Sequence, residues 1–168
     1  MLAYRDGNAG AFETLYTRHR GRLYRFVLRS VKARGTAEEL FQEVWIRVIE
    51  ARGRYAPQAK FTTWLYTIAH NLLTDHWRKK GLTLVELDED SQAPAADDPA
   101  RSVEARQALS RFAGALEALP PAQRQAFLLH EEGGLSIAEI AAATGSNEEA
   151  AKSRLRYAMN KLKEAIGE

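Results

Sequence analysis

Cysteine is absent from the 168 residues of this chain. Disulfide bridges and thiolate metal sites are therefore excluded, and the absence fits a reducing compartment. The sequence also lacks any run of about eighteen apolar residues, so we expect no membrane-spanning helix. Its N-terminus shows no signal-peptide pattern. We expect a cytoplasmic protein without membrane insertion.

The residue patterns of enzymes and metal sites are absent as well. No nucleophile is accompanied by a general base, and there is no glycine-rich phosphate loop. His70 and His76, with Asp75 beside them, are the candidate general bases of a hydrolase. Their spacing places the two imidazoles far apart around a helix, which argues against a shared metal site. We expect no catalytic residue, no metal and no cofactor, and a hydrolase is a weak alternative.

No strand pattern occurs, whereas apolar residues recur at helical spacing through most of the chain. The predicted fold class is all-α, with an N-terminal helical bundle (residues 1–80) and a C-terminal helix-turn-helix domain (residues 104–168). Residues 81–103 are acidic and contain Pro94 and Pro99, which predicts a flexible linker. The expected helices are 9–33, 37–52, 61–80, 104–118, 121–131, 136–145 and one that ends near residue 166.

Charge is distributed unevenly along the chain. Residues 1–80 hold 15 lysines and arginines against 7 acidic residues, and residues 81–103 hold one arginine against six acids. Residues 104–168 are nearly balanced, with 8 basic and 9 acidic residues. A basic N-terminal region favours a polyanionic partner, although an unevenly charged solvated surface is the simpler alternative.

Helix-end signals are clear in the second half of the chain. Ser136 with Glu139 predicts a capping box, Gly145 predicts a helix C-terminus, and Ser146 with Glu149 predicts a second capping box. A short helix, a tight turn and a longer helix are typical of a helix-turn-helix motif. In the N-terminal half, Thr36 with Glu39 predicts one further N-cap.

The last helix has an apolar stripe formed by Ala151, Leu155, Ala158, Leu162 and Ile166. The residues outside that stripe are suited to contact phosphates and base edges in a major groove: Lys152, Ser153, Arg156, Tyr157 and Asn160. A helical hairpin with a charged surface is the alternative. Glu148 and Glu149 begin the helix and repel phosphate, which predicts weak duplex binding by the free protein.

The helix of residues 61–80 has a polar side with short hydrogen-bonding groups: Thr63, Thr67, His70, Asn71, Thr74 and Arg78. Such groups suit recognition of unpaired bases, whose edges are open. Trp64 and Trp77 fall on the apolar stripe and are expected in the core. On the helix of residues 37–52, Ile46 lies among acidic residues, which favours a protein-binding face.

Three blocks of the chain together resemble a bacterial RNA polymerase sigma factor of the extracytoplasmic-function group. They are "AEELFQEVWIRVIEA", "FTTWLYTIAHNLLTDHWRKK" and "LPPAQRQAFLLHEEGGLSIAEIAAATG" followed by "AKSRLRYAMNKLKEAI". The resemblance implies a four-helix domain that binds core polymerase and the minus-ten promoter element. It also implies a helix-turn-helix for the minus-thirty-five element, without the middle domain of other sigma factors.

The same resemblance implies roles for individual residues. Contact with the largest subunits of core RNA polymerase falls on Glu39, Gln42, Glu43 and Ile46. Binding of the melted minus-ten strand falls on the loop 53–61, with Tyr55, Lys60 and Phe61, and on His70, Asn71, Arg78, Lys79 and Lys80. Binding of the minus-thirty-five duplex falls on Lys152, Ser153, Arg156 and Tyr157.

The resemblance further implies promoter DNA and an anti-sigma protein as partners, and no enzymatic activity. The segment "SNEEAAKSR" departs from the small or hydroxyl residues that commonly precede Lys-Ser-Arg in the family, so the minus-thirty-five sequence is left open. A stand-alone helix-turn-helix regulator is the alternative, and it predicts tight duplex binding without polymerase.

Overall fold

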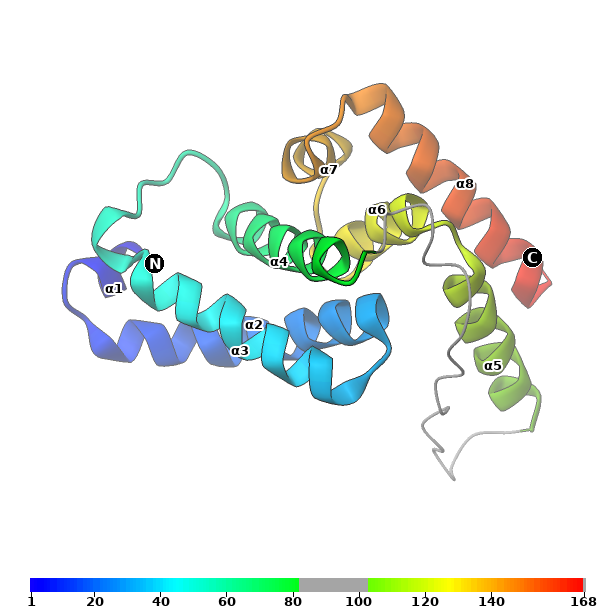
Figure 1. Cartoon of the computed structure of the whole chain (residues 1–168), viewed down its shortest axis with the longest axis horizontal. Coiled ribbons are helices and arrows are strands. Elements are labelled where there is room, and N and C mark those ends of the chain that lie inside the picture. The colour runs from blue at the N-terminus through cyan, green and yellow to red at the C-terminus, as the bar shows by residue number, and fades with distance from the viewer. Residues whose placement is uncertain (82–102, 168) are drawn as a thin grey trace.

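The computed structural model describes residues 1–81 and 103–167, and all regular structure within them is helical. The all-α prediction is therefore confirmed, and the predicted linker lies almost wholly outside the described residues. Figure 1 shows the arrangement. The helices of the N-terminal domain are α1 (Leu2–Arg5), α2 (Ala9–Val31), α3 (Arg34–Glu50) and α4 (Phe61–Lys79), with a 3-10 turn at Arg52–Arg54. Those of the C-terminal domain are α5 (Val103–Ala118), α6 (Pro121–Glu131), α7 (Ile137–Thr144) and α8 (Glu148–Ile166).

In the N-terminal domain, α3 packs against both α2 and α4. Buried Leu23, Phe26 and Val27 on α2 form the centre of its core. At the end near α1, Trp45 makes edge contacts with the rings of Phe12 and Tyr16, at centroid distances of 5.8 and 5.1 Å. Aromatic pairs in this geometry add to the free energy of burial. The apolar stripe of each helix thus determines which side faces inward.

Three details of the N-terminal domain differ from the sequence-based expectations. Helix α3 begins at Arg34, and Thr36 lies inside it rather than capping it. The cause is a tight connection: Lys32 has a φ of 64°, and the chain enters the next helix at once. Ile49 is 46% exposed and does not belong to the buried stripe. The short helix α1 was not expected.

In the C-terminal domain, α8 packs against α5, α6 and α7. The capping box of Ser136 with Glu139 is confirmed, and Gly145 ends α7 with a φ of 65°, a conformation that glycine adopts without strain. The second predicted capping box is wrong. Asn147 caps α8 instead, and its side chain accepts a hydrogen bond from the Ala150 amide.

The two domains pack directly against each other. Helix α6 contacts α2, and α7 contacts α4. As a result most of the buried hydrophobic residues of both domains belong to one continuous cluster. This packing determines which polar side chains of α4 are accessible.

Candidate nucleic-acid and protein interfaces

The outward side of α3 carries two exposed isoleucines among polar residues. Ile46 and Ile49 are each 46% exposed, so the predicted exposure of Ile46 is confirmed and a second apolar residue joins it. Glu39 and Gln42 are exposed beside them, and Glu43 accepts a hydrogen bond from Arg47 at 2.9 Å. We name these five residues, Glu39, Gln42, Glu43, Ile46 and Ile49, the α3 outer face. Exposed apolar side chains with a polar rim are typical of protein-binding surfaces.

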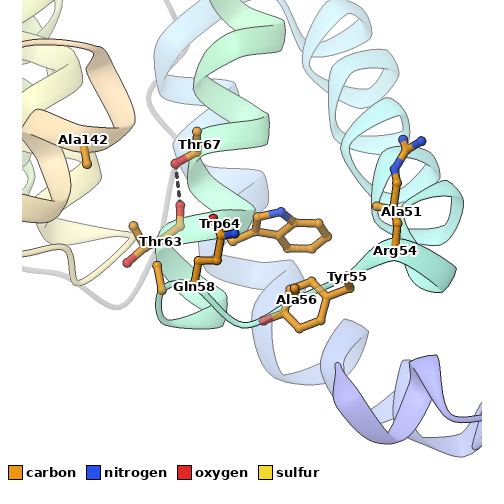
Figure 2. Close-up of a pocket in the computed structure, with 10 residues that line it drawn as sticks. Ala51, Arg54, Tyr55, Ala56, Gln58, Thr63, Trp64, Thr67 and Ala142 are labelled. Carbon is orange, nitrogen blue, oxygen red and sulfur yellow. Dashed lines mark hydrogen bonds between the residues drawn. The ribbon is translucent and has the colours of Figure 1, made fainter.

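A pocket of about 440 Å³ opens at the N-terminal end of α4 (Figure 2). The rings of Tyr55 and Trp64 meet edge to face, with centroids 4.8 Å apart. Thr63 is 6% exposed, and its hydroxyl oxygen has no hydrogen-bond partner among the described residues. We name this cavity the α4 pocket; it is lined by Ala51, Arg54, Tyr55, Ala56, Gln58, Ala59, Thr63, Trp64, Thr67 and Ala142.

The pocket combines an aromatic wall with polar groups, which is the composition of a site for a planar polar ligand such as a base. Burial raises the pKa of Tyr55, so its phenol remains a neutral hydrogen-bond donor over the physiological range. The predicted strand-binding residues differ in their position relative to the pocket. Tyr55 lines the pocket, and Lys60 and Phe61 flank it. Asn71 lies outside it, exposed on α4.

The predicted polar side of α4 is not fully exposed, and for Thr63 and His70 the expectation of an open surface is wrong. His70 is 7% exposed because α6 packs over it. Its Nδ1 donates to the Gln125 side-chain oxygen at 3.2 Å, and the Gln125 amide donates to the Ser30 hydroxyl at 2.8 Å. Burial lowers the pKa of His70 and so favours a neutral ring with its proton on Nδ1, whereas the hydrogen bond to Gln125 acts in the opposite direction.

Tyr66 is also buried between the domains. Its hydroxyl donates to the backbone carbonyl of Glu132 at 2.9 Å, and burial raises its pKa. The Glu132 side chain is itself only 7% exposed and forms ion pairs with Arg25 and Arg29 at 3.1 and 2.9 Å. A carboxylate at this depth is tolerated because both guanidinium groups donate to it.

The two remaining sets of predicted DNA-binding residues are accessible. Arg78, Lys79 and Lys80 are exposed at the C-terminal end of α4, with Arg78 3.3 Å from Asp75. On α8 the buried residues are Ala151, Leu155, Ala158 and Leu162, as expected, whereas Ile166 is half-buried. Lys152, Arg156 and Tyr157 are exposed and Ser153 is half-buried, with the Arg156 guanidinium 5.6 Å from the Tyr157 ring centroid.

The family comparisons agree with this geometry. Residues 15–83 match the family model described as sigma-70 region 2, and residues 109–162 match sigma-70 region 4. The RNA polymerase sigma factor CarQ of Myxococcus xanthus is 36% identical over 169 residues, covering 100% of this chain and 96% of CarQ. The extracytoplasmic-function (ECF) sigma factor SigF of Caulobacter vibrioides is 33% identical, covering 99% and 91%. The chain belongs to the ECF group of RNA polymerase sigma factors.

Solved structures agree with this assignment. The sigma factor RpoE of Bartonella quintana, crystallised with the anti-sigma factor NepR, has a TM-score of 0.74 and 26% identity. The match covers 94% of this chain and 97% of RpoE. CnrH, solved with the cytosolic domain of CnrY, shares the fold with a TM-score of 0.69 and 24% identity over 99% of this chain and 95% of CnrH. The present chain is therefore a promoter-specific initiation factor that acts with core RNA polymerase, and a stand-alone regulator is not favoured.

One set of charged residues in this sigma factor was missed by the sequence reasoning. Five cations follow one another at alternating spacings of four and three residues, which places the four arginines along one side of α2 and the lysine at its C-cap: Arg18, Arg22, Arg25, Arg29 and Lys32. That spacing was the available signal. The acidic partner Glu132 had no such signal, because it lies in the turn after α6 and far away in sequence.

Within residues 1–81 and 103–167, no group of three or more histidines and carboxylates is placed to hold a metal ion. No helix in the same ranges is sufficiently long and apolar to cross a membrane.

Proposed function

We propose that this sigma factor uses three separate surfaces, one each for the melted minus-ten strand, core RNA polymerase and the minus-thirty-five duplex. The α4 pocket is the observation that carries this proposal. An aromatic wall next to a buried hydroxyl that has no hydrogen-bond partner within residues 1–81 and 103–167 suits a base that has left the duplex, because the base can stack and hydrogen-bond at once. Stacking on an aromatic side chain is worth about 1–3 kcal/mol per base. The pocket therefore supports capture of a flipped base from the melted minus-ten strand.

The rest of the minus-ten strand is assigned to residues around the pocket. Lys60 and Phe61 flank the entrance, Asn71 contacts a neighbouring unpaired base, and Arg78, Lys79 and Lys80 hold phosphates. The exposure and positive charge of Arg78, Lys79 and Lys80 support this role, because backbone contacts determine the path of the strand. His70 belongs to this surface once α6 has moved away from it.

The α3 outer face is assigned to core RNA polymerase. Ile46 supplies the apolar anchor, and Glu39, Gln42 and Glu43 supply the polar rim, in the manner of interface centres elsewhere. The exposed side of α8 is assigned to the minus-thirty-five duplex, with Lys152, Ser153, Arg156 and Tyr157 in the major groove. The domain boundaries that match these roles are residues 1–80 and 104–168.

Regulation by a second protein is part of the proposal. RpoE of Bartonella quintana, whose fold this chain shares over most of its length, was crystallised with an anti-sigma factor. We infer that an anti-sigma protein also binds this chain. The factor performs no chemistry of its own and acts in the bacterial cytoplasm, where core polymerase carries out nucleotidyl transfer.

Holoenzyme reconstituted on a target promoter tests the separation of the two DNA sites. Asn71→Ala should reduce the permanganate-reactive open complex, because its base partner exists only after melting. A pre-melted bubble over the minus-ten element should restore the melting part of the loss. Gln107→Ala, an exposed amide on α5, is the matched control and should behave as wild type.

Lys152→Ala combined with Arg156→Ala should instead weaken initial promoter binding, and the bubble should not restore it. Each bidentate base contact in the major groove contributes about 1–3 kcal/mol of discrimination. If the bubble rescues the α8 variant and leaves Asn71→Ala no better, the two domains have been assigned to the wrong promoter elements.

A further inference from the structure

The ion pairs that join the two domains all place the positive charge on the same domain. Four such pairs are formed between described residues, and in each one the cation belongs to the N-terminal domain. Their acidic partners are only three glutamates of the C-terminal domain. The pairs are Arg25 with Glu132, Arg29 with Glu132, Lys32 with Glu117 and Lys60 with Glu139, at 3.1, 2.9, 3.5 and 3.3 Å.

The centre of this contact resembles an anion site. The Glu132 carboxylate is held by the side chains of both Arg25 and Arg29, with the Arg25 Nε within 3.2 Å of each carboxylate oxygen. Paired guanidinium groups present several fixed N–H donors, which is the geometry that also binds phosphate oxygens. Two arginines one helical turn apart therefore form a site for one anionic group, and in this structure the occupant is a side chain of the same protein.

This anion site lies beside the proposed strand-binding surface. Tyr66 and His70 on α4 contact the same part of the C-terminal domain, through Glu132 and Gln125. Lys60, at the entrance of the α4 pocket, pairs with Glu139 of α7. The C-terminal domain thus covers His70 and neutralises the cations on both sides of it.

We propose that Arg25, Arg29 and Lys32 form, together with Lys60, a surface for the phosphates of single-stranded promoter DNA, and that Glu132, Glu117 and Glu139 occupy this surface in the free protein. The inference rests on the proposed role of α4 in holding the melted strand. It adds α2 to the DNA-binding residues, and it gives the C-terminal domain a second role as an internal competitor of DNA.

Competition of this kind has a defined consequence for affinity. When only a fraction of the molecules has the surface free, the apparent affinity for DNA is reduced by that fraction. Removal of the Glu132 charge should therefore strengthen binding, and removal of its arginine partners should not, although both changes break the same ion pairs. This asymmetry separates a DNA-phosphate site from a simple structural contact.

The test uses the full chain and fluorescein-labelled oligothymidylate, whose binding does not require base recognition. Glu132→Gln should bind the oligonucleotide more tightly than wild type by about tenfold at low salt, and the gain should shrink as salt is raised. Glu131→Gln has the same change in charge at an exposed neighbouring position and should remain close to wild type. Arg25→Gln with Arg29→Gln should show no gain, whether alone or combined with Glu132→Gln.

Domain separation is measured in parallel by energy transfer between dyes on Thr17→Cys and Lys163→Cys, two exposed positions in a chain without cysteine. Glu132→Gln and the double arginine variant should both lower the transfer, with circular dichroism unchanged. If Glu132→Gln leaves the domains closed, Tyr66→Phe is added to remove a second contact. Closed domains in that variant, or open domains without tighter DNA binding, would overturn the proposal.

Arg47→Gln with Lys161→Gln removes two exposed charges elsewhere and is the control for the double arginine variant. If it abolishes the gain of Glu132→Gln as completely as the α2 change does, the effect is one of net charge and the site assignment fails. Failure of the proposed function is seen separately, because it would appear as an unaltered open complex in Asn71→Ala holoenzyme.

Discussion

Helices α7 and α8 of the C-terminal domain begin by different means from α3 and α4 of the N-terminal domain. In the C-terminal domain, Ser136 accepts from the Glu139 amide at 3.2 Å and the Glu139 carboxylate accepts from the Ser136 amide at 2.8 Å. Asn147 caps α8 and Gly145 ends α7. In the N-terminal domain, α3 and α4 have no side-chain cap at all. Local sequence therefore defines the helix ends of the helix-turn-helix, whereas packing defines those of α3 and α4.

The two domains also differ in the side chains that they expose. The N-terminal domain presents cations and the isoleucines of the α3 outer face, whereas the C-terminal domain directs Glu117, Glu132 and Glu139 at its neighbour. Helices α7 and α8 carry their own end signals, so their ends do not depend on contact with the N-terminal domain. A domain with a surface rich in cations and apolar groups depends on partners to cover that surface.

The largest expected effect is a loss of polymerase binding when the α3 outer face is altered. Gln42→Ala combined with Ile46→Glu should weaken core polymerase binding by about 2 kcal/mol or more, because truncation of a central interface anchor typically has that cost. Pull-down of core polymerase measures it, with circular dichroism as the check on folding. Leu2→Glu alters a similarly exposed apolar residue, 44% exposed, away from α3 and should bind normally. Normal binding by the α3 variant would show that the polymerase contact lies elsewhere.

A smaller effect on the free energy of unfolding tests whether helix ends in the two domains depend on local caps. Ser136→Ala should lower the free energy of unfolding by about 1 kcal/mol, because it removes an N-cap hydrogen bond. Thr36→Ala removes the residue that sequence alone predicts as a cap, yet it should change stability little, since Thr36 lies within α3. Urea unfolding of the two variants gives both numbers. Equal losses would mean that α3 depends on a local cap after all.

The smallest effect concerns pH and the contact between the domains. Burial under α6 lowers the pKa of His70 below its ordinary value of about 6.5, so the docked state takes up a proton less readily than the separated state. The contact between the domains is therefore strongest at a pH above the ordinary pKa of histidine, and it weakens as the pH falls toward the lowered pKa of His70. Energy transfer between the two dyes should decrease from pH 7.5 to pH 5.5, roughly one unit on either side of the ordinary pKa.

His70→Gln should remove this dependence, because glutamine does not titrate in that range. Burial also lowers the pKa of His76, with nearby Lys80 contributing, but His76 takes no part in the domain contact. His76→Gln should therefore keep the pH dependence of wild type. A response that survives in His70→Gln would assign the titration to another group.

Much of this architecture follows from patterns among residues close together in the chain. Apolar spacing predicts the helices, and the Ser136 capping box with Gly145 predicts the turn of the helix-turn-helix, because these interactions span only three or four residues. The outward positions of Ile46, Lys152 and Arg156 follow from the same periodicity. The order and spacing of the three sequence blocks carried the family resemblance as well.

The accessibility of the candidate sites depends instead on contacts between distant residues. His70 is buried by Gln125, which lies 55 residues away, and Arg25 is neutralised by Glu132, which lies 107 residues away. No local period reveals such pairs, because a polar side chain on a helix has the same spacing whether water or a second domain faces it. Periodicity assigns a residue to one side of its helix, and the packing of α6 and α7 against α2 and α4 determines whether that side is open to DNA.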